Sequence, residues 1–239
     1  MSEVNPLVLV LAGIKVLSFL FISFHLGLSH GNFEKTSTLI KQCASRGATM
    51  VFLPECADYV AQDPSETILL AEEITGNFVS QMKNLAKSTG VWISFGMHRK
   101  DQTKSSDEKP FNSHILLDPF GRLRACYDKI HLFHSPLANC SESSSISGGS
   151  ELVPPIDTPV GKLGLAICFD LRFPEIALRL ANKAANIIAF PSAFHPTTGA
   201  AHWEVLLRAR AIENQVYVIG AAQAGKHNEN RSSYGHTMV

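Results

Sequence analysis

The stretch VGKLGLAICFDLRFPE at residues 160–175 decides the fold of this chain, because it joins a buried strand to a helix through a short turn. The apolar run at 163–167 predicts the strand, and Cys168 stands where that strand ends. Pro174 and the acidic residue after it are typical of a helix start, and we expect this helix to run to Ala185. The stretch therefore predicts a strand–turn–helix unit with a cysteine at its turn.

A cysteine at such a turn has two interpretations. Backbone N–H groups and the positive end of a helix lower the pKa of a thiol, so Cys168 is a candidate nucleophile as a thiolate. The alternative is a small buried apolar residue, as most free cysteines are. The stretch alone leaves both open, because a nucleophile also needs a base and a group that stabilises the oxyanion.

The composition excludes several classes of protein. A chain of 239 residues fits one large α/β domain or two small ones. Lys plus Arg and Asp plus Glu number 21 each, so no basic surface indicates a nucleic-acid partner. Five cysteines form no CxxC pair and no pair with histidine at zinc spacing, so we expect neither a disulfide framework nor a metal site. A reducing compartment is expected, the cytoplasm or the mitochondrion.

Residues 1–30 form an atypical apolar segment. Leu7–Ala12 predicts a first strand, but the apolar character continues through Gly13–His30. Leu7–Leu28 is long enough to anchor the chain in a membrane, and this stays an alternative. The residues before it contain Glu3 and no Lys or Arg, which argues against a signal peptide, so a membrane is not the expected partner.

Downstream of this segment, strands and helices alternate, which favours an α/β fold. Asn32 is expected to begin a helix and Gly47 to end it. Strands are expected at 48–53, 91–97, 186–190 and 216–222, helices at 33–46, 65–88 (broken near Gly76) and 202–214, and a hairpin at 112–117 and 122–128, which makes the sheet mixed.

Three polar residues stand at the ends of predicted strands: Glu55 after MVFLP, Lys129 after RACYD and Cys168 after LGLAI. Ligands of α/β folds collect outside the carboxyl ends of strands, so we expect the three residues to share one site. There Glu55 can act as a base if burial raises its pKa, and Lys129 can stabilise an oxyanion with a backbone N–H after Cys168. The alternative is a structural ion pair between Glu55 and Lys129.

Three segments resemble the glutamate, lysine and cysteine motifs of the nitrilase superfamily of carbon–nitrogen hydrolases: MVFLPE (50–55), YDKIHLF (127–133) and GLAICFDLRFPE (164–175). The resemblance runs from about residue 31 to the end of the chain. It implies an α/β fold, a four-layer α-β-β-α sandwich with mixed sheets, that pairs as a homodimer and uses no cofactor.

The resemblance also implies a thiol amidase that acts on a small carboxylate-bearing amide. Cys168 attacks the amide carbonyl and forms a thioester, Glu55 transfers the protons, and Lys129 stabilises both tetrahedral intermediates. Glu142 in CSESSS matches a second glutamate that many members carry, and its alternative is a solvated loop acid.

Within the superfamily the chain resembles the Nit-type branch whose members hydrolyse deaminated glutathione, notably in DPSETILLAEEITG (63–76) and SSYGHTMV (232–239). The neighbouring ω-amidase branch, which acts on α-ketoglutaramate, usually has alanine where Pro174 stands, so Pro174 favours the first branch. A non-catalytic relative that keeps the fold is the remaining alternative.

The resemblance and the position of FHPTT (194–198) indicate a substrate-binding wall beside the nucleophile. Arg172 can bind a substrate carboxylate through paired hydrogen bonds, or it can form an ion pair with Glu175. His195 can equally be an exposed loop residue. The substrate-binding candidates are Phe169, Arg172, Phe194, His195 and Thr197.

The resemblance divides the chain into residues 1–30 and a carbon–nitrogen hydrolase domain at 31–239. Gly13–His30 has no counterpart in the family, so it is either an anchor or a misread gene segment. The family continues with further strands beyond the last residues of this chain, which implies that the domain is truncated at its C-terminal end.

Overall fold

The computed structural model describes residues 7–11, 14–19, 29–103, 105, 108–135 and 140–239. The first sheet follows the order β1-β2-β3-β5-β6-β7, and β4 pairs with β5. Its strands are β1 (Leu7–Leu11), β2 (Ile14–Phe19), β3 (Met50–Phe52), β4 (Glu72–Glu73), β5 (Trp92–Lys100), β6 (Phe111–Leu117) and β7 (Leu123–Asp128). The second sheet follows the order β10-β11-β12-β13, and it consists of β10 (Ile156–Thr158), β11 (Gly161–Leu165), β12 (Ile187–Ala189) and β13 (Tyr217–Ile219).

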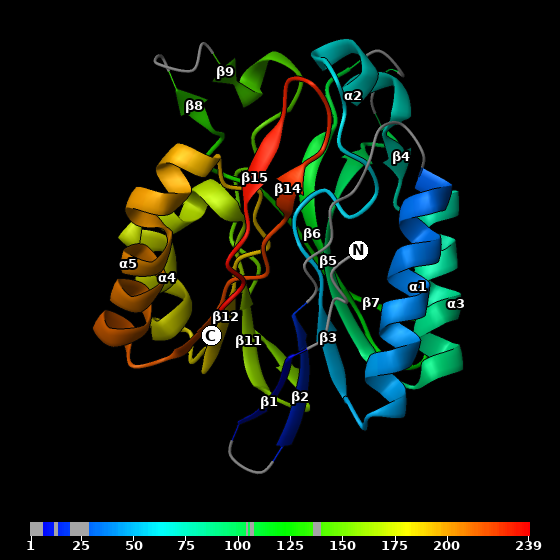
Figure 1. The fold of residues 1–239 in the computed structure, drawn as a ribbon. Coiled ribbons are helices and arrows are strands. Elements are labelled where there is room, and N and C mark those ends of the chain that lie inside the picture. The colour runs from blue at the N-terminus through cyan, green and yellow to red at the C-terminus, as the bar shows by residue number, and fades with distance from the viewer. Residues whose placement is uncertain (1–6, 12–13, 20–28, 104, 106–107, 136–139) are drawn as a thin grey trace.

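Helices cover the outer faces of the two sheets. Helices α1 (Ser29–Ser45) and α3 (Asn77–Thr89) lie beside the first sheet, and α4 (Pro174–Asn182) and α5 (Pro196–Asn214) lie beside the second (Figure 1). Strands β3 and β5 are parallel whereas β5, β6 and β7 run antiparallel, and β10 is antiparallel to an otherwise parallel second sheet. The predicted α-β-β-α sandwich with mixed sheets is confirmed.

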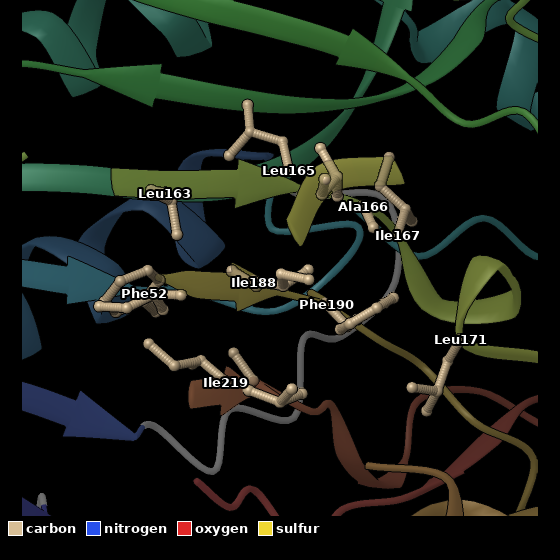
Figure 2. Close-up of a cluster of buried hydrophobic side chains, with 14 of the residues drawn as sticks. Phe52, Leu163, Leu165, Ala166, Ile167, Leu171, Ile188, Phe190 and Ile219 are labelled. Atoms are coloured by element: carbon tan, nitrogen blue, oxygen red, sulfur yellow. The ribbon is translucent and has the colours of Figure 1, made fainter. Parts of the chain in front are cut away.

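Two apolar cores hold these layers together. Met50 and Phe52 of β3 face the second sheet, whereas Val51 between them faces the helices, because successive side chains of a strand point to opposite faces. Figure 2 shows Phe52 in the inner core with side chains of β11, β12 and β13, among them Leu163, Ile188 and Ile219. Both faces of β3 and of the central part of β5 are therefore buried.

Some helices begin at other residues than the sequence predicts, because contacts made in the folded chain differ from the expected local capping. Helix α1 begins at Ser29, so Asn32 is not its N-cap, and the Asn32 amide instead donates to the carbonyl of Asp58 at 2.9 Å. Gly47 ends that helix as predicted, with a φ of 86° that favours glycine. Helix α5 begins at Pro196, earlier than predicted, because the ring of His195 accepts a hydrogen bond from the helix N-terminus.

The N-terminal segment adds two strands to the first sheet. The predicted first strand is present as β1, and β2 pairs with it antiparallel and with β3 in parallel. Part of the stretch Gly13–His30 therefore extends the sheet, while residues 12–13 and 20–28 lie outside the described residues. Within the described part of the chain, no helix is both long and apolar enough to span a membrane.

Candidate active site

The residues that follow the predicted strands meet in one cavity of about 370 Å³. Glu55 follows β3, Lys129 follows β7, and Cys168 follows β11, so three strand ends contribute to its wall. Glu142 joins them from a 3₁₀ turn, Glu142–Ser144. Glu55, Lys129 and Cys168 thus line one cavity, and their catalytic roles stay a prediction.

The turn that carries Glu55 lies directly against β5. The Gly96 N–H donates to the carbonyl of Pro54 at 3.1 Å, and the Gly96 carbonyl accepts from Ala57 N–H at 2.8 Å. A Cβ atom at Gly96 would lie 2.7 Å from the Cα of Glu55. Glycine at this position therefore permits the close approach that fixes Glu55.

Glu55, Asn112, Lys129 and Glu142 form a buried carboxylate–lysine cluster. Lys129 Nζ lies 2.9 Å from Glu55 Oε1 and 2.8 Å from Glu142 Oε2. Asn112 Nδ2 donates to the same Glu55 Oε1 at 2.7 Å and to Glu142 Oε1 at 2.8 Å. Phe133 N–H completes the set by donating to Glu142 Oε2 at 2.7 Å. Each carboxylate is thus held by at least two donors.

The charges of the cluster stabilise one another. Burial alone would lower the pKa of Lys129, but Glu142 and Glu55 raise it well above its usual value. Burial alone would raise the pKa of Glu142, but the charge of Lys129 and the surrounding N–H donors lower it below 4.5. Lys129 is therefore a cation and Glu142 an anion at neutral pH.

Cys168 begins a 3₁₀ turn and is 7% exposed. Its φ of 41° lies in the left-handed region, and its N–H donates to the Pro191 carbonyl at 3.0 Å. Burial and the charge of Glu55 raise the pKa of the Cys168 thiol well above its usual value, against the opposing effects of Lys129 and the Ala193 N–H. The prediction of a lowered pKa is wrong, because burial beside a carboxylate outweighs the turn's N–H groups.

Asp170 joins the cysteine turn to the segment that carries the lysine. Its Oδ2 accepts from Ile167 N–H at 3.0 Å and from Tyr127 O–H at 2.8 Å. Its Oδ1 accepts from His131 N–H at 3.0 Å and lies 2.9 Å from His131 Nδ1. This fully buried carboxylate fixes Cys168 relative to Lys129.

Four of the substrate-binding candidates line the cavity, and one does not. Phe169, Arg172, Phe194 and His195 belong to the wall, whereas Thr197 is exposed and Thr198 lines the cavity instead. The guanidinium of Arg172 lies over the Phe169 and Phe194 rings at 5.6 and 5.4 Å. It also lies 3.1 Å from the imidazole of His202 and forms no ion pair with Glu175 within the described part of the chain.

Sequence reasoning missed Asn112, Asp170 and Arg231, all of which lie at or beside this site. Asn112 is a buried polar residue in a predicted strand, and such a residue needs partners. Asp170 follows the cysteine by two positions, so its place in the motif was a usable signal. Arg231 carried no local signal. Among the residues with described positions, no cluster of His, Cys, Asp and Glu is arranged to hold a metal ion.

Comparison with known proteins identifies the family. A family model described as carbon-nitrogen hydrolase matches residues 28–239, and the chain belongs to this family. A mouse (Mus musculus) protein named deaminated glutathione amidase is 47% identical over 212 residues, which cover 87% of this chain and 66% of the mouse protein. This chain therefore spans slightly less than two thirds of that relative.

Solved structures of the same superfamily share the fold. The NitFhit protein of C. elegans superposes with a TM-score of 0.84 at 41% identity, over 91% of this chain and 53% of that one. Nit3 of Saccharomyces cerevisiae, described as a member of branch 10 of the nitrilase superfamily, gives 0.80 at 29% identity, over 92% and 79%. The recognised motifs thus lie in the architecture that the resemblance implied.

Proposed function

We propose that this chain hydrolyses a carbon–nitrogen bond of a small amide through a thioester on Cys168. The observation that carries the proposal is that Cys168 and Glu55 line the same cavity, where the Glu55 carboxylate accepts from Lys129 Nζ at 2.9 Å. A nucleophile, a base and a cation thus adjoin one cavity, which is the set that acyl transfer needs.

In the first half-reaction Cys168 starts as a neutral thiol, in keeping with its raised pKa. Glu55 accepts the thiol proton as sulfur attacks the amide carbonyl carbon. The tetrahedral intermediate then collapses, the carbon–nitrogen bond breaks, and Glu55 passes the proton to the leaving nitrogen. An acyl-thioester and a free amine or ammonia result.

In the second half-reaction Glu55 removes a proton from water as the oxygen attacks the thioester. The carbon–sulfur bond breaks, the proton returns to sulfur, and the carboxylic acid product leaves. Lys129 stabilises the oxyanion of both intermediates. Its longest carboxylate contact, 3.1 Å to Glu142 Oε1, is the one that can be exchanged for the oxyanion at least cost.

Glu142 and Asn112 act as positioning residues in this scheme. Glu142 Oε2 holds Lys129 at 2.8 Å, and Asn112 spans Glu55 and Glu142 through one amide nitrogen. With Lys129 and the base held before substrate arrives, little reorganisation is needed during the reaction.

We infer deaminated glutathione as the substrate. The name of the mouse relative supports this choice, and so does a cavity wall that carries Arg172 without a carboxylate partner among the described residues. Deaminated glutathione bears carboxylates, which guanidinium groups bind through paired hydrogen bonds. α-Ketoglutaramate is the alternative substrate.

The test is turnover of both compounds by the purified chain. We expect release of cysteinylglycine from deaminated glutathione, and complete loss of it in Cys168→Ala. Cys126→Ala, a half-buried cysteine outside the cavity, is the matched control and should retain activity. A folded chain that turns over neither compound would refute the amidase, and a preference for α-ketoglutaramate would assign the ω-amidase reaction.

The assembly and the compartment complete the proposal. We infer a homodimer, supported by apolar side chains that α5 exposes on one face, with Val205 67% and Ile212 69% exposed at a spacing of two turns. The cysteine spacing favours a reducing compartment, the cytoplasm or the mitochondrion. Sedimentation of the purified chain would test the dimer.

A further inference from the structure

Arg231 is a cation on the cavity wall that the catalytic scheme does not use. It is half-buried and lies in the loop between β14 (Ala224–Lys226) and β15 (Ser232–Tyr234). Among the described residues no carboxylate lies within ion-pair distance of its guanidinium. Asp63, another acid of the wall, accepts from the Glu66 N–H at 2.9 Å instead.

The hairpin that carries Arg231 is fixed to the side of the cavity where Glu55 lies. Gln223, just before β14, donates from Nε2 to the backbone carbonyl of Glu55 at 2.9 Å. Asn228, within the hairpin loop, donates from Nδ2 to the carbonyl of Ala61 at 3.2 Å. In Figure 1 the hairpin lies between the two halves of the sandwich. Arg231 is thus held beside the base.

The two arginines of the cavity, Arg172 and Arg231, belong to different segments of the chain. Arg172 ends the 3₁₀ turn that Cys168 begins, and its guanidinium lies over the Phe169 and Phe194 rings at 5.6 and 5.4 Å. Arg231 instead lies in the hairpin that Gln223 binds to the backbone of Glu55. Burial acts against its charge, but Cys56, Glu55, Glu142 and Cys168 raise its pKa above the ordinary value. By its place in the chain Arg172 is therefore next to the nucleophile, and Arg231 lies in the hairpin that is bound to the segment of the base.

This division matches the two halves of an amide substrate. The acyl group becomes attached to Cys168, whereas the leaving amine must lie close to Glu55 to receive its proton. Deaminated glutathione has a carboxylate on its 2-oxoglutaryl group and another on the glycine of its leaving dipeptide. α-Ketoglutaramate has only the first, because its leaving group is ammonia.

We propose that Arg231 forms a second carboxylate-binding subsite, which holds the terminal carboxylate of the substrate's leaving group while Arg172 holds that of the acyl group. The inference rests on the proposed amidase function and deepens it. A planar guanidinium can donate two parallel hydrogen bonds to a carboxylate, so the subsite selects amides whose leaving amine ends in a carboxylate.

The experiment compares deaminated glutathione with an analogue in which the glycine carboxylate is a carboxamide. For the unaltered chain we expect kcat/KM to favour the carboxylate by about 10- to 100-fold, the size of a lost charge-assisted interaction. Arg231→Gln should bring this ratio close to one, and Arg231→Lys should give an intermediate ratio. Arg208→Gln, which removes an exposed arginine paired with Glu204, is the matched control and should keep the full ratio.

The ratio of the two kcat/KM values distinguishes loss of the subsite from a general loss of structure, because a misfolded variant loses activity on both compounds equally. An unchanged ratio in Arg231→Gln, or no preference in the unaltered chain, overturns the subsite while the amidase stands. If the unaltered chain hydrolyses neither compound, calorimetry with Cys168→Ala decides the subsite alone. The subsite is supported if deaminated glutathione binds more tightly than its carboxamide analogue and Arg231→Gln removes this difference. It is overturned if the two compounds bind equally or neither binds.

Discussion

The carboxylate–lysine cluster and the two arginines of the cavity use charged groups in opposite ways. In the cluster, Lys129 Nζ contacts Glu55 and Glu142 at 2.9 and 2.8 Å, so its charge is compensated within the protein. Arg172 and Arg231 line the same cavity without a carboxylate partner among the described residues. In the cluster the protein itself supplies the counter-charge, whereas at the two arginines a bound ligand would have to supply it.

This difference separates chemistry from binding. A cluster whose charged groups are paired before substrate arrives needs little reorganisation during the reaction, which favours catalysis. A partly buried cation without a partner gains most when a ligand brings an anion, which favours recognition. We therefore expect changes in the cluster to reduce kcat or stability, and changes at the arginines to raise KM.

The largest effect is expected from removing the base. Glu55→Gln keeps an oxygen that can accept from Lys129 and Asn112, so the fold should persist. Without a proton acceptor, kcat should fall by about 100- to 10,000-fold. Steady-state kinetics on a variant with an unchanged circular dichroism spectrum would measure this, and activity near that of the unaltered chain would exclude Glu55 as the base.

Removing the central cation should reduce stability. Lys129→Ala leaves two carboxylates close together and buried, so the free energy of unfolding should fall by about 3–5 kcal/mol. Lys226→Ala removes a lysine from an exposed pair with Glu229 and should cost no more than about 1 kcal/mol. Urea denaturation of both variants tests the contrast, and equal losses would show that the cluster is not a tightly coupled unit.

Arg172→Gln should leave stability almost unchanged and weaken substrate binding. Its guanidinium contacts aromatic rings and His202 but no described carboxylate, so its loss leaves no buried charge without a partner. KM for a carboxylate-bearing amide should rise by about 10- to 100-fold with a smaller change in kcat. A fall in kcat alone would place Arg172 with the cluster.

The smallest effect is expected in the acid range. Because the pKa of Glu142 in the folded chain is below 4.5, its ionised form favours folding. The stability it contributes is present above pH 4.5 and is lost as the pH falls toward the lowered folded-state pKa. Glu142→Gln should flatten the fall of unfolding free energy in that window, and an unaltered slope would contradict the assigned shift.

The sequence predicted the three strand ends of the site because they depend on local patterns. Glu55, Lys129 and Cys168 each follow a short apolar strand, and the layer architecture brings the ends of such strands together. The start of α1 could not be predicted, because the Asn32 amide is used by a carbonyl 26 residues away. Local capping preference was overridden by a tertiary contact.

The electrostatics and the cavity wall also exceeded what the sequence could predict. The direction of the Cys168 pKa depends on its burial and its distance from Glu55, which no local motif specifies. Arg231 reaches the cavity only because Gln223 and Asn228 bind its hairpin to the Glu55 side. Long-range hydrogen bonds of this kind leave no periodic pattern in the sequence.

Rapid acid quenching followed by peptide mass spectrometry can detect the thioester that we propose on Cys168. During turnover of deaminated glutathione, we expect a 2-oxoglutaryl adduct on the peptide that contains Cys168, formed and consumed at rates consistent with kcat. The adduct should be absent from Cys168→Ala. Substrate turnover by Cys168→Ala, or an adduct confined to another cysteine, would contradict the account.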